Sequence, residues 1–151
     1  MVRFDAKGRC VMDGIGINGN GKKNGAVKRV LLAEDEEHTI DVLLDIFEAF
    51  FEQSDVCVAR DGHEAVNMAF ELKPDVILMD LGLPKLDGWK ATRSIKSHEE
   101  FFNIPVLAIT AYAMVGDRER AMEAGCDDYF AKPIEVDKFI QFVRPYLNSE
   151  G

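Results

Sequence analysis

Residues 76–88 read VILMDLGLPKLDG, and this stretch decides the fold. Residues 76–79 are all apolar, as expected of a strand that is buried on both faces of a parallel sheet. Asp80 follows at once, and apolar residues resume at helical spacing after Asp87 and Gly88. A buried strand that ends in a carboxylate and leads into a helix is one β-α unit.

The same pattern occurs along most of the chain. Further strands are predicted at residues 30–33, 55–59, 105–109 and 128–131. Helices are predicted at residues 40–51, 61–73, 89–95, 113–124 and 136–147, the second opened by a capping box of Asp61 and Glu64. Five β-α repeats predict an α/β fold with a parallel sheet that is covered by helices on both faces.

The composition restricts the possible classes of protein. The chain has 151 residues, which suggests one domain, and 47% of them are hydrophobic, which is enough to bury a core. No apolar run approaches the ~18–20 residues that span a bilayer, and the N-terminus has no signal-peptide pattern. The cysteines, Cys10, Cys57 and Cys126, are far apart. We therefore expect no disulfide scaffold or zinc site, small packing roles for Cys57 and Cys126, and a reducing cytoplasm as the location.

Residues 1–27 differ from the rest of the chain in composition and in hydrophobic pattern. They hold six of the twelve glycines and show no periodicity, so we predict a flexible basic tail at 1–27 and a folded domain at 28–148. A G-x-G-x-x-G spacing occurs in this tail, but it lacks the flanking strand and helix of a dinucleotide site. Residues 1–29 carry a net charge of +5, which leaves −14 for the remainder. A folded part this acidic repels a phosphate backbone, so nucleic-acid binding is disfavoured.

Chemically active residues stand where the predicted strands end. They are Glu34 and Asp35, Asp80, Thr110, and Lys132. In an open parallel sheet the carboxyl ends of the strands form the ligand-binding edge, so we expect these side chains to converge. Several carboxylates brought together repel one another unless a cation joins them, and Mg²⁺ prefers one or two carboxylates with water and phosphate. The pattern therefore predicts a Mg²⁺-dependent phosphoryl-transfer site.

The four strand-end motifs together resemble the receiver domain of two-component response regulators. They are VLLAED (residues 30–35), VILMDLGLPKLDG (76–88), AITA (108–111) and GCDDYFAKP (125–133). The resemblance covers residues 28–147. It implies a flavodoxin-like (βα)5 fold, with a doubly wound five-stranded parallel sheet in the order 2-1-3-4-5. It also implies a phosphoacceptor that switches conformation, with self-phosphorylation and autodephosphorylation, rather than a turnover enzyme.

The resemblance assigns a role to each acidic residue and to Gly82. Asp80 is the nucleophile that becomes phospho-aspartate, and Asp35 is a direct Mg²⁺ ligand. Glu34 holds the metal through water, and the backbone carbonyl of Gly82 is the third protein ligand. Position 34 has Glu where the family more often has Asp, and the extra methylene favours the water-mediated contact.

The remaining signature residues contact the phosphoryl group or respond to it. By the resemblance, Thr110 hydrogen-bonds the phosphoryl group and Lys132 pairs with it, with Pro133 in the cis form behind the lysine. Tyr129 matches the aromatic switch that turns inward when Thr110 moves. No signature residue is missing, so we expect a functional receiver.

The resemblance also implies partners. A sensor histidine kinase or a histidine phosphotransfer protein donates the phosphoryl group, and a downstream protein binds the face of the fourth helix, fifth strand and fifth helix. We expect no membrane partner, and a monomer or a weak dimer that depends on phosphorylation. Because no output domain follows, we expect a stand-alone receiver of the chemotaxis or phosphorelay type, with an excised domain as the alternative.

Three other functions compete with this one. An aspartate-nucleophile phosphatase needs a second Asp two positions after the first, and that position is Gly82. A flavin-binding doubly wound domain needs a neutral loop after the first strand, where residues 34–37 are acidic and repel phosphate. The third alternative is a receiver that serves only as a binding module, without phosphorylation. A phosphorylation assay would distinguish it from a phosphoacceptor.

Overall fold

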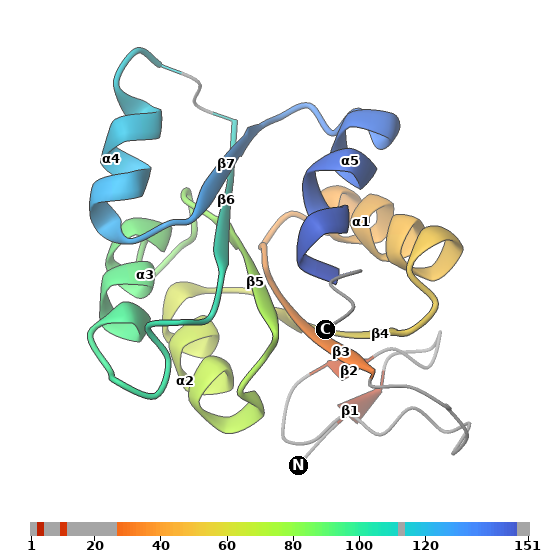
Figure 1. Ribbon diagram of the computed structural model, residues 1–151, viewed down its shortest axis with the longest axis horizontal. Helices are drawn as coiled ribbons and strands as arrows, with labels where there is room; N and C mark the ends of the chain where they lie inside the picture. The colour runs from red at the N-terminus through yellow and green to blue at the C-terminus, as the bar shows by residue number, and fades with distance from the viewer. Residues whose placement is uncertain (1–2, 5–9, 12–26, 112–113, 148–151) are drawn as a thin grey trace.

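The computed structural model describes residues 3–4, 10–11, 27–111 and 114–147. Its core is a five-stranded parallel sheet in the order β4-β3-β5-β6-β7 (Figure 1). Numbered by their place along the chain, these strands run 2-1-3-4-5, as the resemblance implied. The strands are β3 (Lys28–Ala33), β4 (Ser54–Ala59), β5 (Val76–Asp80), β6 (Val106–Thr110) and β7 (Asp128–Ala131).

Helices follow the strands and cover both faces of the sheet. They are α1 (Glu37–Phe50), α2 (Gly62–Leu72), α3 (Gly88–Lys96), α4 (Asp117–Ala124) and α5 (Val136–Leu147). α1 and α5 lie on one face, whereas α2, α3 and α4 lie on the other (Figure 1). Every residue of β5 and β6 is buried, which explains why these strands are apolar up to their last residues, Asp80 and Thr110, rather than alternating.

Two apolar clusters form the core, one on each face of the sheet. Leu31, Ile77 and Met79 point toward α2 and α3, whereas Leu32 and Leu78 point toward α1 and α5. This division follows from the alternation of side chains along each strand. The sheet is therefore fixed from both sides, and its carboxyl edge is a rigid support for whatever stands there.

Local signals set the helix ends on the α2 and α3 side. The Asp61 side chain accepts a hydrogen bond from the Glu64 amide (2.8 Å), and the Asp87 side chain accepts one from the Lys90 amide (2.9 Å). Each aspartate satisfies an amide that the first turn of its helix leaves without a partner. α2 ends at Leu72, and the capping residue Lys73 has a φ of 46°, in the left-handed region.

The fourth helix begins later than the sequence predicts. The expected start was residue 113, but α4 begins at Asp117, and residues 112–113 lie outside the described part of the chain. Gly116 has a φ of 91°, which an α-helix cannot contain. The Asp117 side chain accepts a hydrogen bond from the Met114 amide (3.0 Å), and the Asp117 amide donates to the Met114 carbonyl (3.1 Å). This turn holds residues 114–116 out of the helix.

The N-terminal segment and the cysteines differ in part from expectation. The predicted tail lies outside the described residues, except for Val27 and the short antiparallel pair of β1 (Arg3–Phe4) and β2 (Cys10–Val11). Cys57, in β4, is disulfide-bonded, so the expectation that it serves only as a packing residue is wrong. Cys126 is a free and buried thiol, as expected. Among the described helices, none is long and apolar enough to cross a membrane.

Candidate functional site

Three carboxylates meet at the carboxyl edge of the sheet, as the sequence predicts. Glu34 and Asp35 follow β3, and Asp80 ends β5, the strand beside it. Ala33 pairs with Met79 in the register of these strands, so the residues that come next, Glu34 and Asp80, are also level. One oxygen from each of Glu34, Asp35 and Asp80 lies within 4.8 Å of the others.

The members of this cluster differ in exposure. Glu34 is 1% exposed and Asp80 is 8% exposed, whereas Asp35 lies at the surface. Oxygen donors that converge from two strands and keep an exposed member suit a hard divalent cation such as Mg²⁺, which retains several waters. The residues present therefore fit the metal that the sequence indicates.

Lys132 reaches the cluster from the segment after β7. Its Nζ lies 2.6 Å from Glu34 Oε1 and 3.5 Å from Asp80 Oδ2. The Lys132 amide donates to the Thr110 carbonyl (2.8 Å), which fixes the backbone of the lysine at the end of β6. The peptide bond between Lys132 and Pro133 is cis, as the resemblance implied. The ammonium group thus partly neutralises two buried carboxylates.

Burial changes the ionisation of this pair. The pKa of Glu34 is raised to about 8, chiefly because the buried carboxylate loses hydration, with a further increase from the hydrogen bond and negative charge of Asp80. Lys132 opposes this rise but does not cancel it. Burial lowers the pKa of Lys132, yet the hydrogen bond to Glu34 and the charges of Asp80 and Glu34 outweigh burial and leave that pKa raised. The site favours extra positive charge, whether a proton, an ammonium group or a metal ion.

The backbone around Asp80 is closely packed. The Gly82 amide donates to Asp80 Oδ1 (3.0 Å) and so orients the carboxylate. The Gly88 amide donates to the Leu81 carbonyl (3.1 Å), and a Cβ on Gly88 would lie 2.3 Å from the Asp80 carbonyl oxygen. The position of Asp80 therefore depends on glycine at the start of α3. That the Gly82 carbonyl binds a metal stays a prediction.

Thr110 and Tyr129 stand one and two strands away from Asp80. Asp80 pairs with Ile109 on β6, so Thr110 is the next residue toward the carboxyl edge, where it is 2% exposed. Tyr129 pairs with Ala108 on β7 and packs, half-buried, against the core cluster beneath α2, α3 and α4. Loss of hydration, and secondarily the charge of Asp117, raises the pKa of Tyr129.

Two features of the site are missed by the sequence analysis. Asp117 is buried (8% exposed) beside Tyr129, but its sequence position after Gly116 does not distinguish it from a solvated acid in a first helical turn. A pocket of about 310 Å³ adjoins Lys132 between α1 and the segment before α5. It is lined by Glu36, His38, Thr39, Val42, Lys132, Pro133 and Ile134. Both features depend on contacts between residues that are far apart in the sequence, so no local sequence pattern predicts them.

The sequence of this chain is similar to those of known proteins. Residues 30–144 match the family model described as the response regulator receiver domain. The polar-differentiation response regulator DivK of Brucella anthropi is 41% identical over 122 residues, which are 81% of this chain and 98% of that protein. The DivK protein of Brucella ovis is 42% identical over the same shares of both chains.

Solved structures agree with these relatives. The receiver domain of a sensor histidine kinase from Pseudomonas aeruginosa, crystallised with a magnesium ion coordinated in its active-site cleft, is 35% identical. It superposes with a TM-score of 0.73 over 82% of this chain and 100% of its own. The phosphorylated cyanobacterial phytochrome response regulator RcpA is 25% identical, with a TM-score of 0.74 over 83% of this chain and 98% of its own.

Proposed function

This chain belongs to the response regulator receiver family, and we propose from this premise that it accepts a phosphoryl group on Asp80 in a Mg²⁺-dependent reaction. The donor would be the phosphohistidine of a sensor kinase or of a phosphotransfer protein. The observation that carries the proposal is the convergence of Glu34, Asp35 and Asp80 with Lys132 at one edge of the sheet. The relative from Pseudomonas aeruginosa, which holds magnesium in its cleft, supports the choice of metal.

Asp80 would act as the nucleophile. One of its carboxylate oxygens forms a bond to phosphorus while the P–N bond of the donor phosphohistidine breaks and the imidazole leaves. The Gly82 amide holds Oδ1, so the reacting carboxylate is oriented before the donor arrives. Asp35, Asp80 and the Gly82 carbonyl would hold the metal directly, and Glu34 through water. When bound, Mg²⁺ supplies neutralisation of the negative charge on the transferring group.

Lys132 and Thr110 would stabilise the transferred group. The Lys132 ammonium is already 3.5 Å from Asp80 Oδ2, so it can pair with a phosphoryl oxygen at that position after a small movement. Thr110 lies at the end of the strand next to Asp80, where its hydroxyl can donate to another phosphoryl oxygen. Thr110 ends β6, and the Lys132 amide donates to the Thr110 carbonyl, so both side chains extend from the same edge of the sheet.

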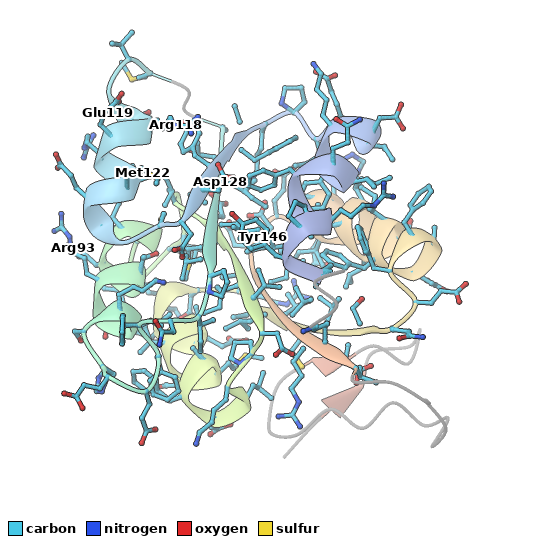
Figure 2. All side chains as sticks on the ribbon, in the orientation of Figure 1. Arg93, Arg118, Glu119, Met122, Asp128 and Tyr146 are labelled. Atoms are coloured by element: carbon cyan, nitrogen blue, oxygen red, sulfur yellow. The ribbon has the colours of Figure 1, made fainter. Side chains whose placement is uncertain are left out.

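The output would pass through the face formed by α4, β7 and α5. Phosphorylation would draw Thr110 toward the site and change the packing of Tyr129, which lies beside the strand that carries Thr110. Figure 2 shows this face, with Arg118, Glu119 and Met122 from α4, Asp128 from β7 and Tyr146 from α5. Met122 is 43% exposed there, which offers an apolar contact to a protein partner.

Intact mass after incubation with acetyl phosphate tests the proposal. We expect a gain of one phosphoryl group that requires Mg²⁺ and disappears in Asp80→Asn. Asp87→Asn is the matched control: it changes another aspartate of the loop after β5, and asparagine can still cap α3. A gain that needs no metal, or that persists in Asp80→Asn, would contradict the mechanism. No gain in the wild type would instead favour a binding module that acts without phosphorylation.

A further inference from the structure

The loop between Asp80 and α3, residues 81–87, lies against the first turn of α2. The Gly62 amide donates a hydrogen bond to the Pro84 carbonyl (3.4 Å). A Cβ on Gly62 would lie 1.7 Å from the Leu86 carbonyl oxygen and 2.5 Å from the Leu86 carbonyl carbon. The backbone of the loop therefore occupies the space that a side chain on residue 62 would need.

The backbone of this loop is strained at Lys85. Its φ of 67° lies in the left-handed region, which is uncommon for residues other than glycine, asparagine and aspartate. The Leu86 amide donates to the Pro84 carbonyl (2.8 Å), which closes a three-residue turn around Lys85. The form of this turn with a positive φ at its centre is the rare and strained one. Such a conformation persists only where neighbouring contacts hold it, and here the turn lies on Gly62.

The same loop contacts Asp80 at its other end. The Gly82 amide donates to Asp80 Oδ1 (3.0 Å). The side chains on either side of Gly82, Leu81 and Leu83, are buried in the core cluster beneath α2 and α3. Because a close-packed interior transmits displacements, a shift of the turn at Lys85 would move the Gly82 amide as well.

An ion pair also joins the loop to α2, but its contribution to holding the loop is small. Lys85 Nζ lies 3.4 Å from Asp61 Oδ2, and the Lys85 side chain is 70% exposed. Water and salt screen a pair as exposed as this one. The backbone contact between Gly62 and Leu86 is therefore the one that fixes where the loop lies.

We propose that Gly62 and the left-handed turn at Lys85 position Asp80 for phosphoryl transfer, by fixing the loop after β5 against the start of α2. The proposal rests on the proposed function and adds two positioning residues to it. Gly62 follows the edge strand β4 and supplies no side chain, so it acts only by leaving room for the loop. The effect can be large, because a misplacement of about 1 Å can slow a reaction about 100-fold.

Gly62→Ala tests the proposal through two measurements. The added methyl group would stand where the Leu86 carbonyl lies, so the loop must move. We expect the ¹⁵N–¹H resonance of Gly82 to shift, because this amide donates to Asp80. We also expect phosphorylation by acetyl phosphate at saturating Mg²⁺, followed by intact mass, to be at least about 10-fold slower than in the wild type. Both measurements are made below the thermal transition of each variant.

Leu72→Ala is the control for a general loss of stability. Leu72 is buried at the opposite end of α2, roughly 15 Å from Gly62 along the helix axis. The substitution leaves a cavity and lowers thermal stability. We expect it to leave the Gly82 resonance in place and the phosphorylation rate within about twofold of the wild type, because the two sites are far apart. Equal slowing by Leu72→Ala and Gly62→Ala would overturn the proposal.

Two substitutions at position 85 separate the backbone conformation from the charge, and they test the proposal even if Gly62→Ala does not fold. Asparagine tolerates the left-handed region but carries no charge, whereas the β-branched valine does not tolerate it. We expect Lys85→Val to shift the Gly82 resonance and to slow phosphorylation at least about fivefold, and Lys85→Asn to stay within about twofold of the wild type. Equal slowing by both would assign the effect to the charge and overturn the proposal.

The resonance of Gly82 is measured without any phosphorylation, so failure of the proposal is distinct from failure of the proposed function. A wild-type phosphorylation rate in Gly62→Ala, or an unshifted Gly82 resonance in Gly62→Ala and Lys85→Val, would overturn the positioning role. The expected shifts in a protein that takes up no phosphoryl group, even as the wild type, would support the contact between loop and helix and overturn the proposed function instead.

Discussion

The guanidinium carbon of Arg120, on α4, lies 5.0 Å from the centroid of the Trp89 ring, on α3. The contact matters because the side chains that α4 buries are those of Asp117, Ala121 and Ala124. Two of these side chains are methyl groups, which bury little apolar area. The cation–π contact therefore adds to the small apolar area that α4 buries.

Arg120→Ala should loosen α4. We expect a loss of about 0.5–1 kcal/mol in the free energy of unfolding, typical of an exposed cation–π pair, and a shift in the fluorescence of Trp89. Urea denaturation followed by tryptophan emission measures both. Arg118→Ala, on the exposed side of the same helix, should leave both unchanged. Equal effects of the two substitutions would show that helix propensity or net charge, and not Trp89, is responsible.

Gly88→Ala should disturb the phosphoacceptor. The added methyl group would lie 2.3 Å from the Asp80 carbonyl oxygen, so the backbone must move, at a cost of about 1–3 kcal/mol. We expect both lower thermal stability and slower phosphorylation by acetyl phosphate. Lys90→Ala, an exposed change in the same helical turn, should alter stability by less than about 0.5 kcal/mol. Normal phosphorylation of Gly88→Ala would mean that Asp80 tolerates the shift.

The stability of the metal-free protein should fall as the pH rises. The pKa of Glu34 is raised from 4.5 to about 8 in the folded state, so the folded protein holds a proton that the unfolded chain releases. This contribution is fully present below pH 4.5 and is lost as the pH rises through about 8. In EDTA we expect a decline on the order of 1–3 kcal/mol across this window, measured by urea denaturation at several pH values.

Two comparisons identify the source of that decline. Glu34→Gln should flatten it, because glutamine does not titrate. Saturating Mg²⁺ should reduce it in the wild type, because the ion stabilises the charged carboxylate and binds more tightly as Glu34 loses its proton. An identical pH dependence in Glu34→Gln would assign the effect to another group.

Asp61→Ala should weaken the start of α2. The Asp61 side chain accepts the Glu64 amide at 2.8 Å, and loss of such a cap costs about 0.5–2 kcal/mol. The same hydrogen bond, as the largest cause, lowers the pKa of Asp61 below 3.8. The ionised form therefore stabilises the fold above pH 3.8, and this part is lost as the pH falls through the lowered value. Thermal melts at pH 7 should show the cost, with Asp61→Asn retaining most of the stability.

Most of the fold could be predicted because each strand of the sheet contains a short apolar run, and two of the following helices begin at an evident capping residue. Asp61 and Asp87 mark two of those starts by residue type alone. The beginning of α4 could not be predicted, because residues 114–116 have no proline or strong break until the left-handed φ of Gly116 is known. The helix propensities of the residues on both sides of Gly116 predict a continuous helix.

The site likewise has parts that the sequence predicts and parts that it does not. The convergence of Glu34, Asp35 and Asp80 follows from strand ends, and these ends are visible in the sequence. The preference of Lys132 for Glu34 over Asp80 is a matter of side-chain reach and burial, which depend on the packed structure. The disulfide bond of Cys57 likewise has no local signal, because the cysteines show no spacing that pairs them.

The order of the strands in the sheet has a consequence for how the site forms during folding. β3 and β5 are neighbours, although β4 and α2 separate them along the chain, and Lys132 arrives only after β7 has paired with β6. The ends of β3, β5, β6 and β7 therefore come together only when the chain has folded as far as the segment after β7. A chain that has not finished folding, or has been cut before β7, carries the acidic residues without their ammonium partner. The proposed acceptor site is therefore complete only in a chain that has folded as far as the segment after β7.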